Sequence, residues 1–292
     1  MQRFNTIAIS GKPHDSGVIE TIKRVAEHLR QLDRTVLIDR ELLDGAVLDG
    51  VQVLPRQELA GHCDLMISVG GDGTLLNTAR LLVDHDVPIL GVNRGRLGFL
   101  VDLSPGNLSE LDMVLAGEYK EDDRILLQAE IRRGEEIIGS GIALNDVVLY
   151  KWNTARLLEF TTYINGELVA HNRSDGLIVS TPTGSTAYAM AGGGPVLHPD
   201  TDALVLVPIC PHTLSNRPLV VSANSEVEIA VQADTVERAA VSCDGQSDMG
   251  LAPGATVAIR RYPRRVRIIH PPQYRYFDLL RAKLRWGDIY VR

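Results

Sequence analysis

The feature that most constrains the fold is an apolar run that ends in a glycine-rich turn. Residues 65–69 read Leu-Met-Ile-Ser-Val, and Gly70-Gly71-Asp72-Gly73-Thr74 follows directly. Apolar residues then recur at helical spacing, namely Leu75, Leu76, Ala79, Leu82 and Val83. A strand, a tight turn and a helix in this order predict a βα unit, which is the building block of a parallel sheet.

The same alternation extends over the first hundred residues. Residues 4–10, 35–38 and 88–92 read as strands, and residues 18–29 carry apolar positions at helical spacing. We therefore expect an α/β domain with a parallel, Rossmann-like sheet that helices cover on both faces. Ligands of such sheets bind beyond the carboxyl ends of the strands, and the glycine turn lies at one of those ends.

The second half of the chain is predicted to be β-rich and sandwich-like. Strands are expected at residues 125–132, 136–150, 158–164, 176–180, 226–232, 238–243, 257–261 and 266–270. Asn165-Gly166 predicts a hairpin turn, and one short helix is expected around residues 185–191. Residues 276–286 return to helical spacing, and this helix is expected to pack back on the first domain. The predicted domains are residues 1–120, joined by 271–292, and residues 121–270.

Bulk composition excludes several classes of function. The formal charge is −7 and aromatic residues make up 5%, which argues against binding to nucleic acid or to an anionic membrane. The three cysteines are widely spaced, and the scattered histidines have no metal-ligand spacing, so neither a disulfide framework nor a structural zinc site is expected. No run of about 18 apolar residues occurs, and we expect a soluble protein of the cytoplasm.

The glycine turn suits phosphate chemistry. Gly70, Gly71, Gly73 and Thr74 allow the backbone to approach a phosphate at a helix N-terminus. Asp72 would repel that phosphate, so we expect it to hold a metal ion or to accept a proton from an attacking hydroxyl. The alternative is an ordinary turn in which Asp72 caps the helix. The GxGxxG and P-loop motifs of the common nucleotide-binding folds are missing.

Three further segments carry candidate binding residues. Residues 93–100 follow a strand, and either Arg94 or Arg96 could bring positive charge to the same sheet edge; a solvated turn is the alternative. Asn145-Asp146 interrupts an apolar run, either as a bulge or turn, or as a pair that binds a ribose diol. Residues 171–188 and 192–195 are rich in small and hydroxyl residues, which lets a flat ring lie between backbone segments; a purely structural loop is the alternative.

Two segments favour structural interpretations. Cys243-Asp244-Gly245-Gln246 reads first as a hairpin turn after a strand. The arginines between residues 260 and 275 alternate with apolar residues, which favours a solvated strand face.

Taken together, these motifs resemble those of the NAD kinase family, in particular its bacterial branch. The matching runs are GGDGT at 70–74, NRGRLGFL at 93–100, ND at 145–146, SDGLIVSTPTGSTAY at 174–188 and CDGQ at 243–246. They span nearly the whole chain, and the TPTGSTAY run is the most specific.

The resemblance implies an active site in the crevice between the two domains. It implies transfer of the γ-phosphate of ATP to the 2′-hydroxyl of the adenosine ribose of NAD, with Mg²⁺ bound mainly through the phosphates. Asp72 matches the catalytic proton acceptor. The expected NAD-binding residues are Asp72, Gly73, Asn145, Asp146, Arg156, Arg173, Asp175, Thr186, Ala187, Tyr188, Ala189, Met190, Ala191 and Gln246. The family usually forms homodimers or homotetramers.

Two alternatives stay open on the residues alone. GGDGT-like runs also occur in phosphofructokinases and diacylglycerol kinases, so the acceptor could be a sugar phosphate or a lipid. A non-catalytic NAD sensor would keep the binding segments, although it would have no need of Asp72 as a base.

Overall fold

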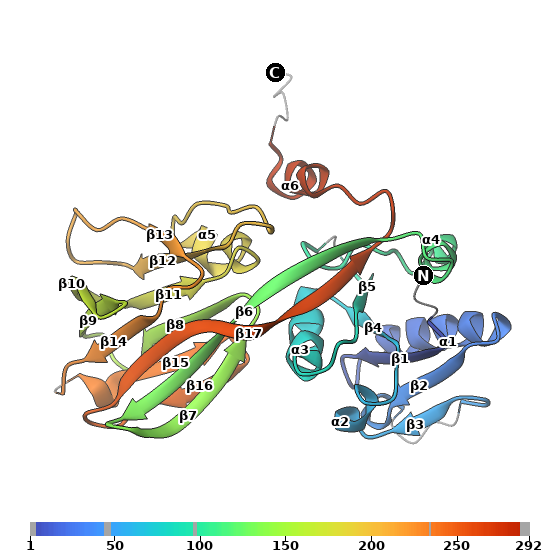
Figure 1. Cartoon of the computed structure of the whole chain (residues 1–292), viewed down its shortest axis with the longest axis horizontal. Coiled ribbons are helices and arrows are strands. Elements are labelled where there is room, and N and C mark those ends of the chain that lie inside the picture. Colours follow the sequence, from blue (N-terminus) through green and yellow to red (C-terminus); the bar gives the residue numbers. More distant parts are fainter. Residues whose placement is uncertain (1–3, 44–47, 96–97, 234, 287–292) are drawn as a thin grey trace. The chain divides into compact units, whose positions relative to one another are not determined.

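The chain divides into two compact units in a computed structural model that describes residues 4–43, 48–95, 98–233 and 235–286 (Figure 1). Unit 1 comprises residues 1–123 and 266–292, and unit 2 comprises residues 124–265. Strands β6 (Lys120–Arg133) and β17 (Thr256–His270) each run from one unit into the other. The boundaries predicted from the sequence, at residues 120 and 270, fall at the ends of these two strands.

Unit 1 contains the predicted parallel sheet. Its strands are β1 (Thr6–Gly11), β2 (Thr35–Asp39), β3 (Gln52–Leu54), β4 (Leu65–Gly70) and β5 (Ile89–Asn93). They lie in the order β3-β2-β1-β4-β5, every neighbouring pair is parallel, and the end of β17 adds a parallel partner to β5. The α/β, Rossmann-like prediction is therefore confirmed.

Helices cover both faces of this sheet. They include α1 (Ser16–Gln31), α3 (Asp72–Leu82) and α4 (Leu108–Leu115). Unit 1 also contains α2 (Arg56–Leu59), α6 (Tyr276–Leu284) and a 3₁₀ turn at Arg40–Leu42. Ile9 and Ile67 share one buried cluster with apolar residues of α1 and α4. On the other face, Thr78 of α3 hydrogen-bonds Ser10 and Ser68 at 2.9 and 3.2 Å. Helix α4 was not predicted, since only eight residues carry its pattern.

A buried histidine anchors the end of β17 in unit 1. Nδ1 of His270 lies 3.2 Å from Oδ2 of Asp102, and its Nε2 lies 3.5 Å from Oδ2 of Asp122. Burial lowers the pKa of His270, but the two carboxylates raise it by more, so the net pKa is raised. The imidazole stacks on Tyr274 at a centroid distance of 3.9 Å.

The C-terminal helix α6 begins at the predicted residue and belongs to unit 1. It ends at Leu284, two residues before the predicted end at Trp286. Leu279 and Leu280 are buried, and the ammonium of Lys283 lies 5.2 Å from the ring centroid of Phe99. Residues 287–292 lie outside the described residues.

Unit 2 is built mainly from strands and has two sheets. Its further elements are β7 (Glu136–Ala143), β8 (Asp146–Lys151), β9 (Leu158–Ile164), β10 (Glu167–Ser174), β11 (Gly176–Ser180), β12 (Ala203–Ile209), β13 (Leu219–Ser222), β14 (Val227–Val231), β15 (Ala239–Cys243) and β16 (Ser247–Gly250). One sheet has the order β13-β12-β11-β8-β15-β16. In the other, β9 pairs with β10 and β14, β14 with β17, and β6 with β17 and β7.

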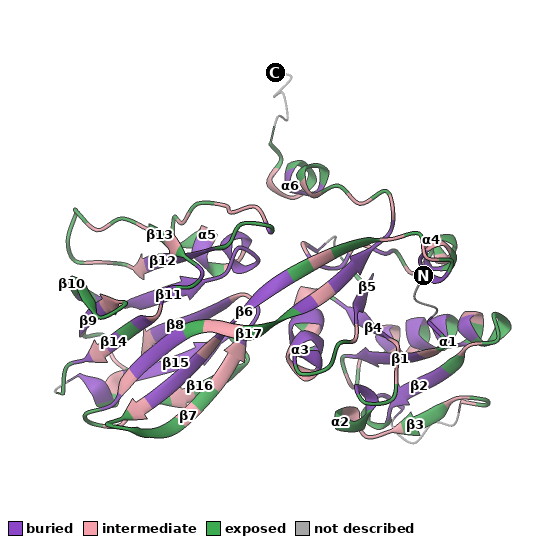
Figure 2. Cartoon of the chain, viewed as in Figure 1, coloured by how far each residue is buried: buried purple, intermediate pink, exposed green. Residues whose placement is uncertain are grey.

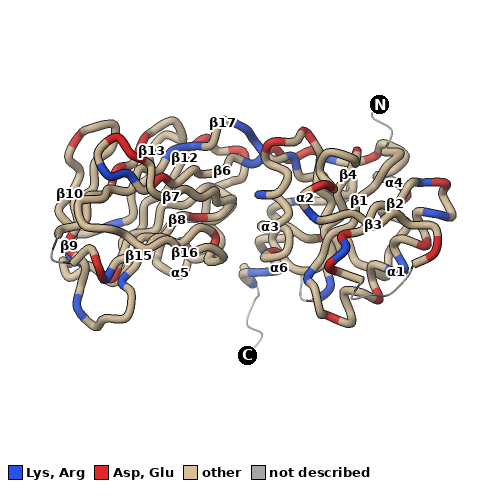
Figure 3. The backbone as a smooth tube through the Cα atoms, turned by 90° about the horizontal axis from the view of Figure 1, so that it is seen from below, with Lys and Arg blue, Asp and Glu red and all other residues tan. Residues whose placement is uncertain are grey.

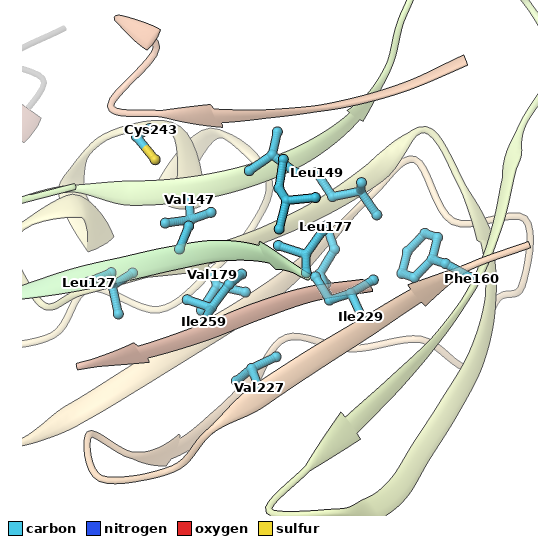
Figure 4. Packing of buried hydrophobic residues seen from close by; sticks show 14 of the residues in the cluster. Leu127, Val147, Leu149, Phe160, Leu177, Val179, Val227, Ile229, Cys243 and Ile259 are labelled. Atoms are coloured by element: carbon cyan, nitrogen blue, oxygen red, sulfur yellow. The ribbon is translucent and has the colours of Figure 1, made fainter. Parts of the chain in front are cut away.

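The core of unit 2 lies between these sheets, as a sandwich requires. Figure 4 shows Val147 and Leu149 of β8 gathered with Leu177 and Val179 of β11 and with Ile229 of β14. These residues alternate along their strands, which places every second side chain in the core. The strands carry most of the buried residues, while loops and turns are largely exposed (Figure 2). The prediction of a β-rich, sandwich-like domain is confirmed.

Three local predictions for unit 2 were wrong. Residues 136–150, expected as one strand, form β7 and β8, which belong to different sheets. Residues 257–261 and 266–270, expected as two strands, belong to the single strand β17. The helix expected around 185–191 is a 3₁₀ turn at Gly184–Thr186 followed by α5 (Tyr188–Ala191).

Charged residues of both signs are interspersed over both units (Figure 3). The arginines of β17 take part in ion pairs: Arg260 contacts Glu130 at 2.7 Å, Arg265 contacts Asp202 at 2.6 Å, and Arg267 contacts Asp86 at 2.8 Å. Within the described residues, no helix combines the length and apolar character needed to cross a membrane.

Candidate functional site

The glycine turn lies at the carboxyl end of β4 in unit 1, where the sequence predicted it. Strand β4 ends at Gly70, Gly71 is the N-cap of α3, and Asp72 is the first residue of that helix. A Cβ atom on Gly70 would lie 2.8 Å from Cβ of Thr74, so only glycine fits this close approach. Around Gly71, by contrast, no heavy atom of the described residues lies within 4 Å of a Cβ position. The turn is tight on its inner side and open on its outer side.

Backbone groups hold the Asp72 carboxylate. The N–H of Phe99 donates to Oδ2 at 2.8 Å, and the N–H of Leu100 donates to Oδ1 at 3.0 Å. Gly98 packs directly against the carboxyl group: a Cβ there would lie 2.8 Å from Cγ of Asp72. A carboxylate offers about four lone-pair sites, so each oxygen keeps capacity for another donor. Asp72 does not cap its own helix, because Gly71 occupies that position and no side-chain cap bond is formed there.

Arg94 brings positive charge to the same sheet edge. Strand β5 pairs with β4 up to Asn93 opposite Gly70, and the N–H of Arg94 donates to the carbonyl of Gly70 at 3.1 Å. The Arg94 guanidinium lies over Gly17 in the first turn of α1, where a Cβ would lie 2.8 Å from Nε. The prediction that an arginine of this segment reaches the edge therefore holds for Arg94. Arg96, the other candidate, lies outside the described residues.

Unit 2 contains a pocket of about 400 Å³ on the outer face of its six-stranded sheet. Its lining residues are Asn145, Asp146, Val148, Tyr150, Ala187, Tyr188, Ser242, Asp244 and Gly245. This volume lies within the roughly 300–1,000 Å³ typical of ligand pockets. Four of the residues predicted to bind NAD therefore meet in one pocket: Asn145, Asp146, Ala187 and Tyr188.

Strand alternation explains how this pocket forms. Val147 and Leu149 point into the core, so Asp146, Val148 and Tyr150 line the opposite face. Helix α5 packs on that face through Ala189, which joins a small cluster with Ile178 and Val205 among others. The pocket adjoins the start of this helix, at Ala187 and Tyr188.

The TPTGST run packs against the Asn145 backbone. The hydroxyl of Thr181 donates to the carbonyls of Leu144 and Asn145 at 2.5 and 3.2 Å. A Cβ on Gly184 would lie 2.5 Å from the carbonyl carbon of Asn145 and closer still to its oxygen. Glycine is therefore required at residue 184. The run holds the backbone of Asn145, which lines the pocket, whether or not the run also contacts a ligand.

Asp244 organises the pocket and was not predicted as a site residue. The structure confirms the hairpin turn that the sequence favours here, because β15 pairs with β16 across it. The Asp244 side chain, however, accepts hydrogen bonds from the N–H groups of Leu144, Asn145 and Asp146 at 3.1, 2.7 and 3.3 Å. Asp244 lies in the CDGQ run, but a hairpin turn explains that run without any role for the Asp244 side chain.

Asp146 is an acid of the pocket with a raised pKa. The residue is buried, with 5% of its surface exposed. Burial, together with the nearby carboxylate of Asp244, raises the pKa of Asp146 to about 7. Ser242, which also lines the pocket, has a buried hydroxyl with no hydrogen-bond partner among the described residues. The pocket thus offers hydrogen-bonding groups to a polar ligand.

The other predicted NAD-binding residues do not line this pocket. Arg173 of β10 is exposed and pairs with Glu159 at 2.9 Å, whereas Asp175 pairs with Lys151 at 2.7 Å. Arg156 is exposed in the loop before β9. Thr186, Ala189, Met190 and Ala191 neighbour the lining residues Ala187 and Tyr188, and Gln246 follows Gly245. Their contacts with NAD stay predictions.

Among the described residues, no group of three or more His, Cys, Asp and Glu side chains is arranged to hold a metal ion. The carboxylate at the glycine turn is Asp72, whose two oxygens each receive one N–H donor.

Comparison with known proteins places both units in one family. The family model described as the ATP-NAD kinase N-terminal domain matches residues 7–119, and the ATP-NAD kinase C-terminal domain matches residues 144–271. An NAD kinase of Halorhodospira halophila is 49% identical over 288 residues, covering 97% of this chain and 94% of that protein. An NAD kinase of Pseudomonas putida is 47% identical and covers 99% of this chain and 98% of that protein.

Solved structures share the fold. An NAD kinase from Archaeoglobus fulgidus in complex with ATP has a TM-score of 0.74 at 28% identity, covering 96% of this chain and 98% of that one. Yeast NADH kinase complexed with NADH has a TM-score of 0.89 at 22% identity, covering 99% of this chain and 90% of that one; this likeness concerns the fold alone.

Proposed function

The chain belongs to the ATP-NAD kinase family, and from this premise we propose which residues carry out each part of NAD phosphorylation. The enzyme catalyses ATP-dependent phosphorylation of NAD. In our proposal the acceptor is the 2′-hydroxyl of the adenosine ribose, and the γ-phosphate of ATP is transferred to it. Alternative acceptors, such as a sugar phosphate or a lipid, are not favoured by the family match.

Asp72 is the proposed proton acceptor. A ribose hydroxyl is a weak nucleophile at neutral pH, and a carboxylate within hydrogen-bond reach contributes roughly 10²–10⁴-fold to the rate by accepting its proton. The observation that carries this assignment is the pair of N–H donors from Phe99 and Leu100, which fix the carboxylate and leave lone pairs on both oxygens. An aspartate held only to cap α3 would not need this arrangement.

The glycine turn is the proposed phosphate-binding element. Gly70, Gly71, Gly73 and Thr74 stand at the N-terminus of α3, where the helix dipole and backbone N–H groups favour an anion. Arg94 adds positive charge at the same sheet edge. The divalent ion, proposed to be Mg²⁺, enters as part of MgATP and is held mainly by the phosphates, whose charge it neutralises.

The unit 2 pocket is the proposed site for the ribose and base of NAD. Asn145 and Asp146 offer an amide and a carboxyl to the ribose hydroxyls, and the Ser242 hydroxyl is available for a further hydrogen bond. Ala187 and Tyr188 present small and flat surfaces beside them. Arg156, Arg173, Asp175 and Gln246 are retained as candidates for contacts with the remainder of the dinucleotide.

We further propose that the enzyme acts in the cytoplasm as a homodimer or homotetramer. All three cysteines are free thiols, as is usual in a reducing compartment. Leu168 and Val169 on β10, and Leu219 and Val220 on β13, are exposed apolar residues on strands at the ends of their sheets, which suits association between copies. Light scattering coupled to gel filtration measures the oligomer directly.

The direct test is NADP formation from purified protein, NAD, ATP and Mg²⁺, with Asp72→Asn as the decisive variant. We expect Asp72→Asn to keep the circular dichroism spectrum and the NAD affinity but to lower kcat by about 10²–10⁴-fold. Turnover near the wild-type rate would remove Asp72 from the base role. Tight NAD binding without any turnover by the wild-type protein would instead favour a sensor.

A further inference from the structure

Asp244 fixes the strand junction that carries the proposed ribose-binding pair. It begins an Asp-Gly turn in which both residues are left-handed, with φ of 54° at Asp244 and 63° at Gly245. Two left-handed central residues define the type I′ turn of tight hairpins. The turn directs the Asp244 carboxylate at three successive N–H groups, those of residues 144–146, while the N–H of Asp244 donates to the carbonyl of Asp146 at 2.9 Å.

The same geometry brings two carboxyl groups together in very different surroundings. Asp244 is half-buried, and its three N–H donors compensate a negative charge through charge-assisted hydrogen bonds. No hydrogen bond to the carboxyl oxygens of Asp146 is found among the described residues, and this residue is buried. When two carboxyl groups interact at close range, the one in the less compensated environment retains its proton.

We propose that Asp244 is a positioning residue for NAD: it fixes the Asn145–Asp146 backbone and lets Asp146 hold its proton up to near-neutral pH, so that the protonated Asp146 donates a hydrogen bond to the ligand. The inference rests on the proposed function, in which this pocket holds the ribose of NAD. A protonated carboxyl both donates and accepts, whereas an ionised one only accepts. The raised pKa of Asp146, about 7, is consistent with this assignment.

The other titratable groups of the pocket do not compete for this role. Tyr150 and Tyr188 line the pocket. Burial, together with a hydrogen bond to Asp248, raises the pKa of Tyr150, so this phenol stays neutral between pH 5.5 and 8.5. Strand β11 contributes no titratable side chain, and Cys243 of β15 points into the core with Val147. Asp244 is therefore the charged group that faces Asp146.

The proposal predicts a specific pH dependence of NAD affinity. Since only protonated Asp146 donates, wild-type affinity should fall as the pH rises above about 7, by at most tenfold per pH unit. Asp244→Asn removes the neighbouring charge but keeps an oxygen acceptor, and asparagine tolerates the left-handed turn. Asp146 then ionises at lower pH, and the decline in affinity should begin at a lower pH than in the wild-type protein. Asp146→Asn is a permanent donor, so its affinity should not change between pH 5.5 and 8.5.

The experiment measures the NAD dissociation constant by calorimetry, without ATP, across this pH range for the wild-type protein and the two variants. Asp200→Asn, which removes one exposed acidic charge elsewhere in unit 2, serves as the control and should follow the wild-type profile. A loss of affinity in Asp244→Asn that is equal at every pH would overturn the charge role. A wild-type pH dependence that survives in Asp146→Asn would overturn the donor role. No NAD binding by the wild-type protein would count against the proposed function itself.

Discussion

Gly98→Ala tests whether the Phe99–Leu100 segment positions Asp72. A methyl group on Gly98 would lie 2.8 Å from Cγ of Asp72 and closer still to Oδ1. Carbon atoms in contact prefer about 3.5–4.0 Å, so the carboxyl group must move by about 1 Å. A displacement of about 1 Å at a reacting group can cost about 10²-fold in rate, equivalent to about 2.7 kcal/mol. We therefore expect kcat to fall about 100-fold.

The assay compares kcat and the NAD dissociation constant of Gly98→Ala with those of Gly95→Ala. Gly95 lies in the same segment, but no heavy atom of the described residues lies within 4 Å of its Cβ position. Gly95→Ala should therefore retain turnover. Because Gly98 is not part of the unit 2 pocket, NAD affinity should be unchanged in both variants.

A double variant shows whether the effect passes through Asp72. If Gly98→Ala acts only by displacing that carboxylate, adding it to Asp72→Asn should slow the enzyme no further, because the two changes remove the same contribution. A Gly98→Ala variant with kcat within about twofold of Gly95→Ala, the scatter of independent sites, would refute the reasoning. So would a double variant that is slower than Asp72→Asn by the full product of the two effects.

Two further changes follow from the packing and charges described above. Gly184→Ala places a methyl group against the Asn145 carbonyl. We expect overpacking to lower the free energy of unfolding by about 1–3 kcal/mol, so that the melting temperature falls, and we expect NAD to bind more weakly. Gly250→Ala is the control, because its Cβ position has no neighbour within 4 Å among the described residues. The raised pKa of His270 stabilises the fold fully below its unfolded value of about 6.5, and this contribution is lost as the pH rises through the folded pKa. In denaturant titrations, the loss of stability in His270→Gln should therefore be largest below about pH 6 and shrink toward high pH; an equal loss at every pH would contradict this.

Local pattern was sufficient to predict the parallel sheet of the first unit and the turn that follows β4, although β3, α2 and α4 were not predicted. The strand at 65–69, the glycine turn and the helix at 72–82 are all encoded within about 20 consecutive residues, and their order implies a parallel sheet with a ligand-binding edge. Arg94 could be placed at that edge for the same reason, because it follows the next strand in the sequence. The N–H groups that hold Asp72 could not be predicted, since they come from a segment 27 and 28 residues away.

Distant contacts caused the main error in the second unit. Residues 136–150 have no glycine or proline at the junction between β7 and β8, so the sequence reads as one long strand. The chain leaves one sheet and enters the other at Leu144-Asn145, where Asp244 accepts the N–H groups and Thr181 donates to the carbonyls. The ladder hydrogen bonds of a continuous strand are thus replaced by side chains from 37 and 100 residues away.

In the candidate site, too, the residues could be recognised from the sequence, whereas their partners could not. Asn145 and Asp146 were recognisable because polar residues within an apolar run need partners, but the sequence could not say that the main partner is Asp244. The cross-strand pairing of Arg173 with Glu159 was equally hidden, because it depends on the register of β9 and β10. A binding residue can therefore be named from its own surroundings, whereas its protonation state depends on a second carboxylate that only the fold supplies. For this reason the pH profile of NAD binding, more than any loss of activity, distinguishes a carboxyl that donates from one that merely occupies the pocket.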